Sequence, residues 1–572
     1  MTENEPKLNK RERYKAKLRP IDYYEQFESL DFENLGEGDR FYLQDFGIFT
    51  TDFLEDEFTL RIRVPGGRLE AAQLLAVSDV VTEHDLTLIL TARGGIQLHG
   101  LDPDNIREVY DRINGLGLTT WQSFGDNVRN IVTDVFDGCG TTGEIEAWPL
   151  VEGMQAFVLK NPRYVGMLPR RVSVGITGNR ANVVSFYAND LAFVLAEKDG
   201  VKGFNVFMGG KNTEVAQPAD IFLQPDEVVD FFKAFVEAFY KHGSRGSRAY
   251  TRLFYLIEKI GMDGLKAHIA QEYGREFTPA GTLLQEEKYF ETYEPLSDGT
   301  WGYRYETDFG RADAEELAAL ARYAEENGAQ VRLGIDQNIY LLGLKEKDAP
   351  PASPKPSATV LACAGAGNCP YSFWSIKDEC SLYLPLEKIH RYRISVGFSG
   401  CAKGCGRHRH TDIGLIGLKT NHFGDTEGGA RIFVGAEHHS GRSVGWQLFS
   451  MVPFEHLHDV IDALVTLFEQ SGFDTFEQFA AGGLNRFSPS FVSMWMLLNF
   501  KTGQSLPLPI DRASEGAMDK EVALLEEAFG GETIPQNEKA FFDAIGALAK
   551  ELWTVAGKDP TYKPPIERTV FR

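Results

Sequence analysis

The sequence has few cysteines, no long apolar run and no signal-like amino terminus. Six cysteines in 572 residues are too few for a disulfide scaffold and suit a reducing compartment. No run of about 18 apolar residues is present, so no transmembrane helix is expected. The first residues lack the basic and then apolar pattern of a secretory signal. Together these absences predict a cytoplasmic protein.

The chain also lacks an excess of basic residues. Its net charge of −23 argues against a surface that binds nucleic acid. One basic run stands out near the amino terminus, and its members are Lys7, Lys10, Arg11, Arg13, Lys15, Lys17 and Arg19. Such a run is typical of a solvated, loosely held arm. The alternative is a docking patch for an acidic redox partner.

What the sequence does have is four cysteines gathered in one stretch. Cys363 and Cys369 form a C-x5-C pair, and Cys401 and Cys405 form a C-x3-C pair. Four thiolates can hold either a zinc ion or an iron–sulfur cluster. Zinc sites usually use C-x2-C or C-x4-C pairs, so the spacing and the neighbouring glycines favour the cluster. A cluster indicates electron transfer.

An internal duplication is visible in two pairs of segments. The matching segments are 67–101 with 310–344, and 171–178 with 393–400. Each member of the first pair is predicted to be a helix followed by a strand. In the second pair Asp190 matches Asp412 at the same offset. Two long copies suggest a pseudo-twofold body, and a ligand site between the copies is the natural expectation.

Arginines recur on one face of the predicted strands. The positions that share a face are Arg61 with Arg63, Arg171 with Ser173, and Thr91 with Arg93, Gln97 and His99. Arg129 follows in a polar stretch that runs into an apolar one. For any single arginine an exposed sheet face is the simpler interpretation. Together, with Gly66, Gly67, Gly94 and Gly95 nearby, they predict a cavity for a carboxylate or oxyanion, because arginine matches such groups with several donors.

These motifs resemble those of the sirohaem-dependent sulfite and nitrite reductases. The resemblance runs from about residue 58 to at least residue 440, and the duplication is part of it. It includes the cysteine pairs and the short motifs at 60–67, 90–93, 97–100, 168–171 and 336–338. The resemblance implies an α/β (α+β) fold with an internally duplicated pseudo-twofold body.

The resemblance also implies how the chain divides into domains. A ferredoxin-like domain is expected to be built from both halves, and two related domains are expected to bind sirohaem. The implied segments are an N-terminal arm at 1–54, the ferredoxin-like domain at 55–118 with 288–350, the first sirohaem-binding copy at 119–287, and the second copy, with sirohaem and the 4Fe-4S cluster, at 351–572.

Roles for individual residues follow from the same resemblance. The expected 4Fe-4S ligands are Cys363, Cys369, Cys401 and Cys405, and Cys405 is also the expected axial ligand of the sirohaem iron. The expected anion pocket, which carries the catalytic residues, consists of Arg61, Arg129, Arg171 and Ser173. Further contacts to sirohaem are expected from Thr91, Arg93, Gln97, Gln337, Asn338 and Lys403.

The implied reaction is a six-electron reduction, of nitrite to ammonia or of sulfite to sulfide. Electrons are expected from a separate ferredoxin or flavoprotein, because the chain has no G-x-G-x-x-G fingerprint of its own. Three positions depart from the family pattern. The neutral Ser173 favours nitrite, Lys403 adds a positive charge beside the axial cysteine, and Gly125 replaces a polar side chain. The balance favours nitrite.

Two alternatives remain open at this point. A tetrapyrrole-modifying monooxygenase of corrin biosynthesis has a similar Gly-Cys-Ala-Lys-Gly-Cys motif, here at 400–405. The arginines at 61, 129 and 171 favour the reductase over this enzyme. The other alternative is non-catalytic, a metal site that only staples the C-terminal domain, and the cysteine spacing fits it poorly.

Overall fold

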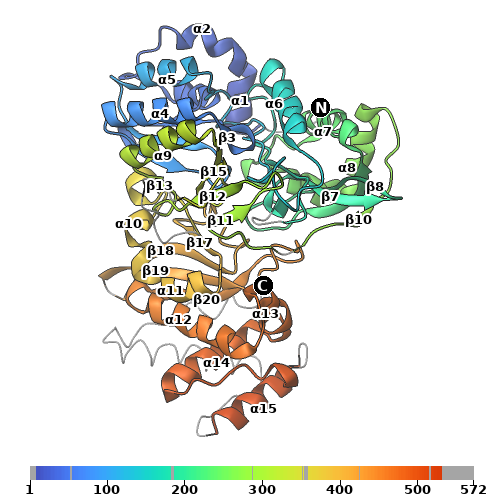
Figure 1. The fold of residues 1–572 in the computed structure, drawn as a ribbon, viewed down its shortest axis with the longest axis vertical. Coiled ribbons are helices and arrows are strands. Elements are labelled where there is room, and N and C mark those ends of the chain that lie inside the picture. Colours follow the sequence, from blue (N-terminus) through green and yellow to red (C-terminus); the bar gives the residue numbers. More distant parts are fainter. Residues whose placement is uncertain are drawn as a thin grey trace, which may run out of the picture. The chain divides into compact units, whose positions relative to one another are not determined.

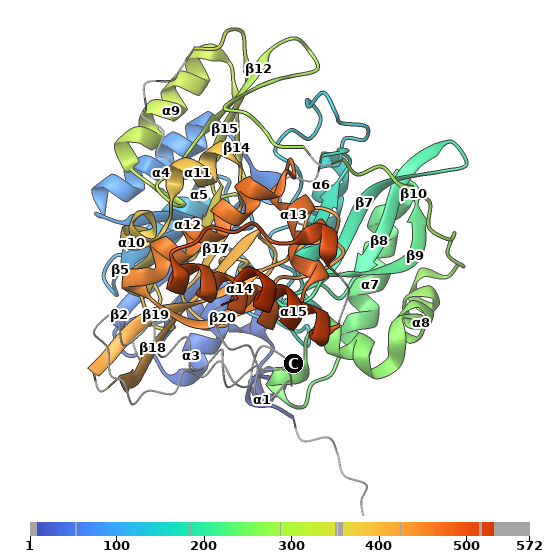
Figure 2. The same ribbon diagram turned by 90° about the horizontal axis from the view of Figure 1, so that it is seen from below.

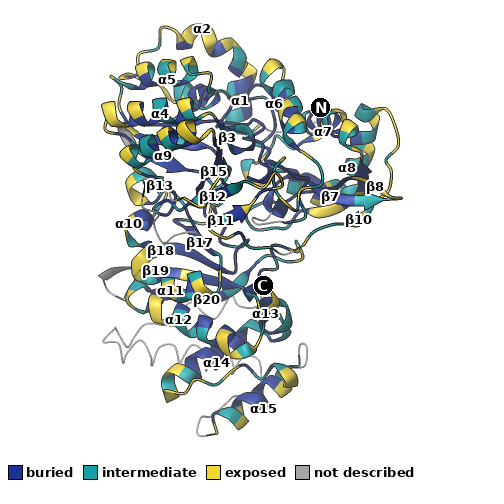
Figure 3. Cartoon of the chain, in the orientation of Figure 1, coloured by how far each residue is buried: buried dark blue, intermediate teal, exposed yellow. Residues whose placement is uncertain are grey.

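A computed structural model describes residues 8–51, 54–181, 186–286, 288–348, 350, 352, 359–423, 425–513 and 517–530. The chain divides into two compact units, Met1–Lys355 and Pro356–Arg572. Three five-stranded sheets belong to the described part of the first unit and one to that of the second. The strands are mostly buried, whereas the helices expose their outer faces (Figure 3). No helix in the described ranges is long and apolar enough to cross a membrane.

Two sheets of the first unit exchange a short strand. The first, in spatial order, contains β1 (Ile48–Thr51), β2 (Leu54–Ile62), β5 (Ile96–Leu101), β4 (Thr87–Leu90) and β13 (Arg311–Ala312). The second contains β11 (Tyr293–Pro295), β12 (Trp301–Tyr305), β15 (Ile339–Leu344), β14 (Gln330–Leu333) and β3 (Arg68–Leu69). Arg311 lies opposite Ile89, and Arg68 lies opposite Arg332. Each half of the sequence therefore completes the sheet of the other half.

The helices of these sheets follow the duplicated pattern. Helix α4 (Ala71–Glu83) precedes β4, and α9 (Ala314–Asn327) precedes β14, so the predicted order of helix and strand is confirmed in both copies. The two helices pack side by side (Figure 1). Asp313 begins α9 by accepting hydrogen bonds from two backbone N–H groups of the first turn. Helix α5 (Ile106–Gly115) packs on β2. One hydrophobic core joins both halves.

The amino-terminal segment is folded onto this core. It contains α1 (Lys10–Lys17), α2 (Tyr24–Phe27) and α3 (Glu37–Tyr42), with 3-10 turns at Pro20–Tyr23 and Leu43–Phe46. Tyr23, Phe27 and Phe46 are buried in the core with β2 and β5. Three aromatic side chains removed from water stabilise this docking by several kcal/mol, at about 1.5–3 kcal/mol for each large apolar side chain.

The interpretation of the basic run as a solvated, loosely held arm is wrong for Lys15, although Lys10, Arg13 and Lys17 of α1 are exposed to solvent. The side chain of Lys15 is buried, and its ammonium group pairs with Glu12 at 2.6 Å and with Asp126 at 2.9 Å. The sequence shows that the run is basic, but not that Asp126, far along the chain, pairs with Lys15. Lys7, the first member of the run, lies outside the described residues.

The third sheet of the first unit is covered by three long helices. Its strands, in spatial order, are β10 (Thr282–Leu283), β7 (Leu191–Lys198), β8 (Val201–Met208) and β9 (Gln217–Leu223), and β6 (Val174–Thr177) also pairs with β7. The helices are α6 (Trp148–Lys160), α7 (Val228–His242) and α8 (Leu253–Tyr273). Figure 2 shows α7 and α8 side by side next to this sheet. Their apolar faces and the strands form one core.

The sheet of the second unit has the same plan. It contains β16 (Val360–Ala362), β17 (Val396–Ser399), β18 (Ile413–Phe423), β19 (Asp425–Val434) and β20 (Trp446–Pro453). In both sheets a parallel start is followed by antiparallel strands. Strands β6 and β17 come from the matched segments of the sequence. The duplication is therefore present in space as well as in sequence.

Helices of the second unit pack around its sheet. They are α10 (Ile376–Tyr383), α11 (Leu386–Arg391), α12 (Phe454–Ser471), α13 (Phe476–Gly482), α14 (Pro489–Thr502) and α15 (Met518–Ala528). Helix α12 lies against β19 and β20 (Figure 1). The α/β character and the duplicated body agree with the fold expected from the sequence. The finer domain boundaries near residues 54, 118, 287 and 350 stay predictions.

Candidate active site

The four predicted cluster ligands lie at one edge of the second unit's sheet. Cys363 directly follows β16, and Cys401 follows β17 by two residues. These strands pair in parallel, so their carboxyl ends meet at the same edge and bring the two thiols together. Cys369 follows a 3-10 turn, and Cys405, the exposed member of the set, lies in the loop after Cys401.

Backbone N–H groups point at the cysteine sulfurs. The N–H of Gly400 donates to Cys363 Sγ at 3.1 Å. Burial raises the pKa of Cys363 to about 12 and the nearby Cys405 adds to this, whereas backbone hydrogen bonds act in the opposite sense. Burial likewise raises the pKa values of Cys369 and Cys401, again against a backbone hydrogen bond. Amide donors aimed at sulfur stabilise thiolates, the form that binds a cluster.

Glycine shapes the cysteine loop, and the cysteine sulfurs are not gathered as closely as at a zinc site. A Cβ at Gly406 would meet the carbonyl oxygen of Phe398 at 1.9 Å, so glycine lets this loop fold back on the strand end. Among the described residues, no three cysteine sulfurs lie within 4.8 Å of one another. A zinc ion, with Zn–S distances of about 2.3 Å, holds its thiolates closer than this. In a 4Fe-4S cluster each thiolate binds a different iron, so the thiolates can lie further apart.

Four arginines gather in the first unit. The guanidinium of Arg61, near the end of β2, lies 3.7 Å from the centre of the Phe124 ring, and that of Arg129 lies 5.9 Å from it. Burial holds the pKa of Arg129 well below its ordinary value, and the positive charges of Arg61, Arg171 and Arg93 lower it further. The four side chains therefore form one cationic group, although separate segments carry them.

Arg129 is held in place by backbone carbonyl groups. Its own N–H donates to Val172 O at 2.8 Å, which fixes the segment beside β6. Its guanidinium donates to Gly125 O at 3.0 Å and to Ser123 O. In the part of the chain that the structure describes, its buried Nε has no acceptor. One donor of a fixed guanidinium is thus available to an anion, which fits the predicted pocket.

Two residues outside the expected anion pocket hold the segments that carry the arginines, and Arg63 was expected on the cavity face beside Arg61. Arg63 is 1% exposed, and its guanidinium donates to the carbonyl oxygens of Val128 and Arg129, each at 2.9 Å. Asn130 donates to Val64 O at 2.7 Å and to Arg93 O at 2.8 Å. The sequence places Arg63 on the same strand face as Arg61 but gives no sign that it is enclosed.

Ser173 is engaged inside the protein. Its hydroxyl donates to Asp190 Oδ2 at 2.8 Å and accepts from the N–H of Asp190 at 3.1 Å. Arg252 pairs with the other oxygen of Asp190 at 2.8 Å. The second copy repeats the arrangement, since the hydroxyl of Ser395 donates to Asp412 at 2.8 Å. The predicted contact of Ser173 with an anion stays a prediction.

The predicted sirohaem contacts of the first unit lie near the ends of β4 and β5. The hydroxyl oxygen of Thr91 accepts from the N–H of Gly95 at 3.1 Å, which closes the turn that carries Arg93. Gln337 donates to Leu90 O at 2.7 Å, so the second half of the chain reaches this turn. Gln97 lies on β5 opposite Arg61.

The two remaining predicted contacts lie elsewhere. The buried amide oxygen of Asn338 accepts from Thr307 N–H at 3.1 Å, and its amide group donates to Asp336 at 3.0 Å. Lys403, in the second unit, is exposed and lies over the ring of Tyr371. The roles of all these residues toward a bound cofactor stay predictions. What the structure brings together is four arginines with a turn in the first unit, and four cysteines in the second.

Comparisons with known families match both parts of the duplication. The family described as "Nitrite and sulphite reductase 4Fe-4S domain" matches residues 124–277 and 390–478. The family described as "Nitrite/Sulfite reductase ferredoxin-like half domain" matches residues 54–116 and 294–356. Each family thus matches the chain twice.

Two curated proteins and one solved structure are also similar to this chain. A "Ferredoxin--nitrite reductase" of Synechococcus elongatus is 30% identical over 495 residues, which cover 80% of this chain and 96% of that protein. An "Assimilatory ferredoxin-dependent nitrite reductase" of Haloferax mediterranei is 26% identical over 80% of this chain and 89% of that protein. The structure of the NirA protein of Mycobacterium tuberculosis superposes with a TM-score of 0.75 at 22% identity, covering 83% of this chain and 96% of that one, which shows a shared fold.

Proposed function

Because the chain belongs to the nitrite and sulphite reductase family, we propose that it reduces nitrite to ammonia at a coupled sirohaem and 4Fe-4S centre. The observation that carries the proposal is one chain with both a four-cysteine sheet edge and a gathered set of four arginines. The curated relatives reported above are named for nitrite. They give no support to the tetrapyrrole-modifying or the non-catalytic alternative.

Each candidate residue has a role in this proposal. Cys363, Cys369, Cys401 and Cys405 hold the cluster, and the exposed thiol of Cys405 also ligates the sirohaem iron. The residues that contact sirohaem and its carboxylates are Thr91, Arg93, Gln97, Gln337, Asn338 and Lys403. When bound, the two cofactors supply the redox chemistry of the six-electron reduction, while the protein supplies position and field.

The arginines bind and orient the anion. The chain as a whole carries a charge of −23, so an anion needs a local basic site against this background. Arg61, Arg129 and Arg171 provide that site, and the held guanidinium of Arg129 keeps a buried Nε donor available. Donors fixed in place before the reaction stabilise negative charge that develops on a departing oxygen, as an oxyanion hole does.

The charge of the pocket favours nitrite over sulfite. Nitrite is a monoanion, whereas sulfite is partly a dianion near neutral pH and benefits from a further cation. Ser173 is neutral, and its hydroxyl is committed to Asp190 at 2.8 Å. The carboxylate of Asp190 is itself matched by Arg252 at 2.8 Å. Ser173 therefore adds no positive charge to the three arginines of the pocket.

The electron donor is inferred from the names of the relatives, and the location from the state of the cysteines. The relatives from Synechococcus and Haloferax are named as ferredoxin-dependent enzymes, and we infer a ferredoxin as the donor for this chain. All six cysteines are free thiols in the structure. A cytoplasmic location, where thiols stay reduced and clusters are assembled, suits such a protein.

The experiment that tests the proposal is a titration of the anaerobically purified protein. Optical spectra are recorded while nitrite or sulfite is added in the presence of a reducing dye. We expect sirohaem bands that shift with nitrite, dye oxidation, and a larger kcat/KM for nitrite than for sulfite. A spectrum with iron–sulfur absorbance alone, or a larger kcat/KM for sulfite, would contradict the proposal.

A further inference from the structure

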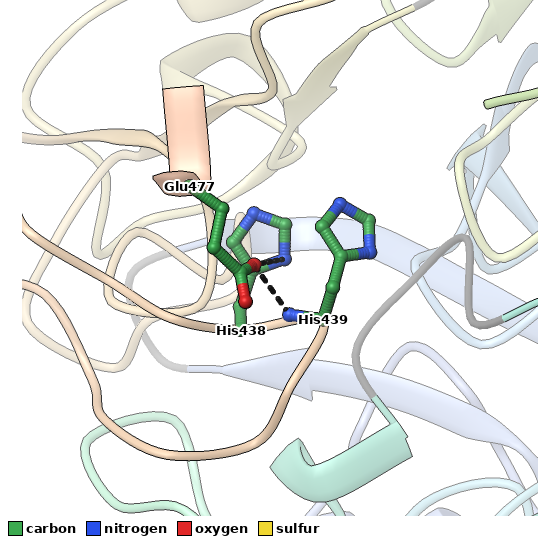
Figure 4. A group of neighbouring side chains, drawn as sticks. All are labelled: His438, His439 and Glu477. Atoms are coloured by element: carbon green, nitrogen blue, oxygen red, sulfur yellow. Dashed lines mark hydrogen bonds and ion pairs between the residues drawn. The ribbon is translucent and has the colours of Figure 1, made fainter. Parts of the chain in front are cut away.

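A second group of metal-ligating side chains lies in the second unit, apart from the cysteines. The loop between β19 and β20 carries His438 and His439, and α13 carries Glu477 (Figure 4). Their exposed fractions are 2%, 6% and 7%, and one ligand atom from each lies within 4.8 Å of the others. The two imidazole rings lie 4.1 Å apart, centre to centre.

The duplication shows what is unusual about this group. In the first copy Asp190 binds Ser173 and forms an ion pair with Arg252 at 2.8 Å. In the second copy Asp412 binds Ser395 in the same way, but its other oxygen faces His438 Nε2 at 3.3 Å. A histidine thus stands where the first copy has a permanent cation.

The second copy also adds a carboxylate. Glu477 Oε2 lies 4.0 Å from His438 Nδ1, on the opposite side of the ring from Asp412. Both carboxylates are buried, and each lies within 4.0 Å of a ring nitrogen of His438. Buried carboxylates are costly unless a cation balances them. A divalent cation at the ring nitrogens would supply that balance.

We propose that His438, His439 and Glu477 bind a divalent first-row transition-metal ion. Two histidines and one carboxylate are a ligand set that zinc and iron(II) use in proteins. Asp412 holds His438 through Nε2 and so directs Nδ1 toward Glu477, which is the usual second-layer arrangement at a metal-bound histidine.

The carboxylate of Glu477 retains room for a metal bond. Its two oxygens accept hydrogen bonds from the N–H groups of His439 at 2.7 Å and Ser440 at 2.9 Å. Each carboxylate oxygen has a second lone pair, so these bonds orient the group without exhausting it. The ion would tie the β19–β20 loop to α13, which gives it a structural role separate from electron transfer.

Zinc is the probe for the test, because it differs from the iron of the cofactors. The cofactor-loaded protein is dialysed against a chelator, incubated with Zn²⁺ and desalted, and its metals are counted by mass spectrometry. We expect about one zinc per chain and a rise in Tm on zinc addition. The variants His439→Ala and Glu477→Gln are expected to bind zinc at least about tenfold more weakly.

Matched variants keep the test decisive. His458→Ala removes an exposed histidine of α12 in the same unit and is expected to bind zinc as the unchanged protein does. Asp412→Asn leaves the three ligands in place and is expected to weaken zinc binding by about 10–100-fold. The proposal is overturned if the unchanged protein binds no zinc, if His439→Ala binds it equally well, or if uptake is lost only on Cys405→Ser, which would place the zinc at the cysteines.

Discussion

The substitution Lys15→Met tests how the amino-terminal helix supports the arginine group. Lys15 Nζ donates to Glu12 at 2.6 Å, Asp126 at 2.9 Å and Leu168 O at 2.8 Å. Asp126 lies three residues before Arg129, and Leu168 three residues before Arg171. One ammonium group thus joins α1 to both segments that carry these arginines.

The expected loss of unfolding free energy in Lys15→Met follows from the burial of the ion pair. Lys15 and Asp126 have side-chain exposures of 2% and 1%, so solvent screening is small. Removing one partner of a buried ion pair costs about 3–5 kcal/mol. Arg248 still pairs with Asp126, which places the expected loss of unfolding free energy at about 3 kcal/mol, the lower end. Because both arginine-bearing segments loosen, we also expect KM for nitrite to rise more than kcat falls.

The assay is denaturant unfolding at pH 7 and at lower pH. Burial alone would raise the pKa of Asp126, but Lys15 and Arg248 lower it below its ordinary value. The stabilisation from this group is therefore present above the unfolded-state pKa, about 3.9, and is lost as the pH falls. The free energy of unfolding should therefore fall less between pH 7 and acid pH in Lys15→Met than in the unchanged protein.

The matched control is Lys17→Met, at an exposed position of the same helix. It is expected to change the free energy of unfolding by no more than about 0.5 kcal/mol. A loss below about 1 kcal/mol for Lys15→Met, or an equal loss for both variants, would refute the reasoning that the buried pair holds α1 in place.

Two further substitutions address the site, and a third addresses Asp45, a buried carboxylate of the turn Leu43–Phe46 that accepts a hydrogen bond from Asn127. Cys405→Ser should abolish sirohaem absorbance and turnover, and normal haem bands in the purified variant would exclude Cys405 as the axial ligand. Arg129→Lys keeps the charge but loses the planar fork, so KM for nitrite should rise about tenfold; an unchanged KM would remove Arg129 from the pocket. Asp45→Asn should stabilise the protein above pH 7 and have little effect near pH 4, because burial raises the pKa of Asp45 to about 7 and ionisation then opposes folding. Unfolding free energies that differ equally at both pH values would contradict this cause.

Local patterns explain which features were predictable. Short segments of sequence are enough to recognise the cysteine pairs and the duplication. Helices α4 and α9 are predicted from the spacing of their apolar residues. The structure also places Arg61, Arg93 and Arg171 close enough to act on the charge of Arg129, whereas Arg63, from the same strand face as Arg61, is enclosed by carbonyl groups.

Features that depend on distant partners were not predictable. Arg63 and Asn130 bind carbonyl groups of separate segments, and a carbonyl acceptor leaves no mark in the sequence. The burial of Lys15 depends on Asp126, far along the chain. The hydroxyl of Ser173 is turned to Asp190 by a loop whose path a single sequence does not give.

The exchange of β3 and β13 bears on how the chain is made. Residues 311–312 complete the sheet of β4, so the amino-terminal sheet stays open at that edge until more than half of the chain has been synthesised. Contacts between positions so far apart in the sequence slow folding. Until β13 is available, the open edge of β4 can pair with strands of other chains. We expect expression to benefit from slow synthesis at low temperature, and the amino-terminal half alone to aggregate.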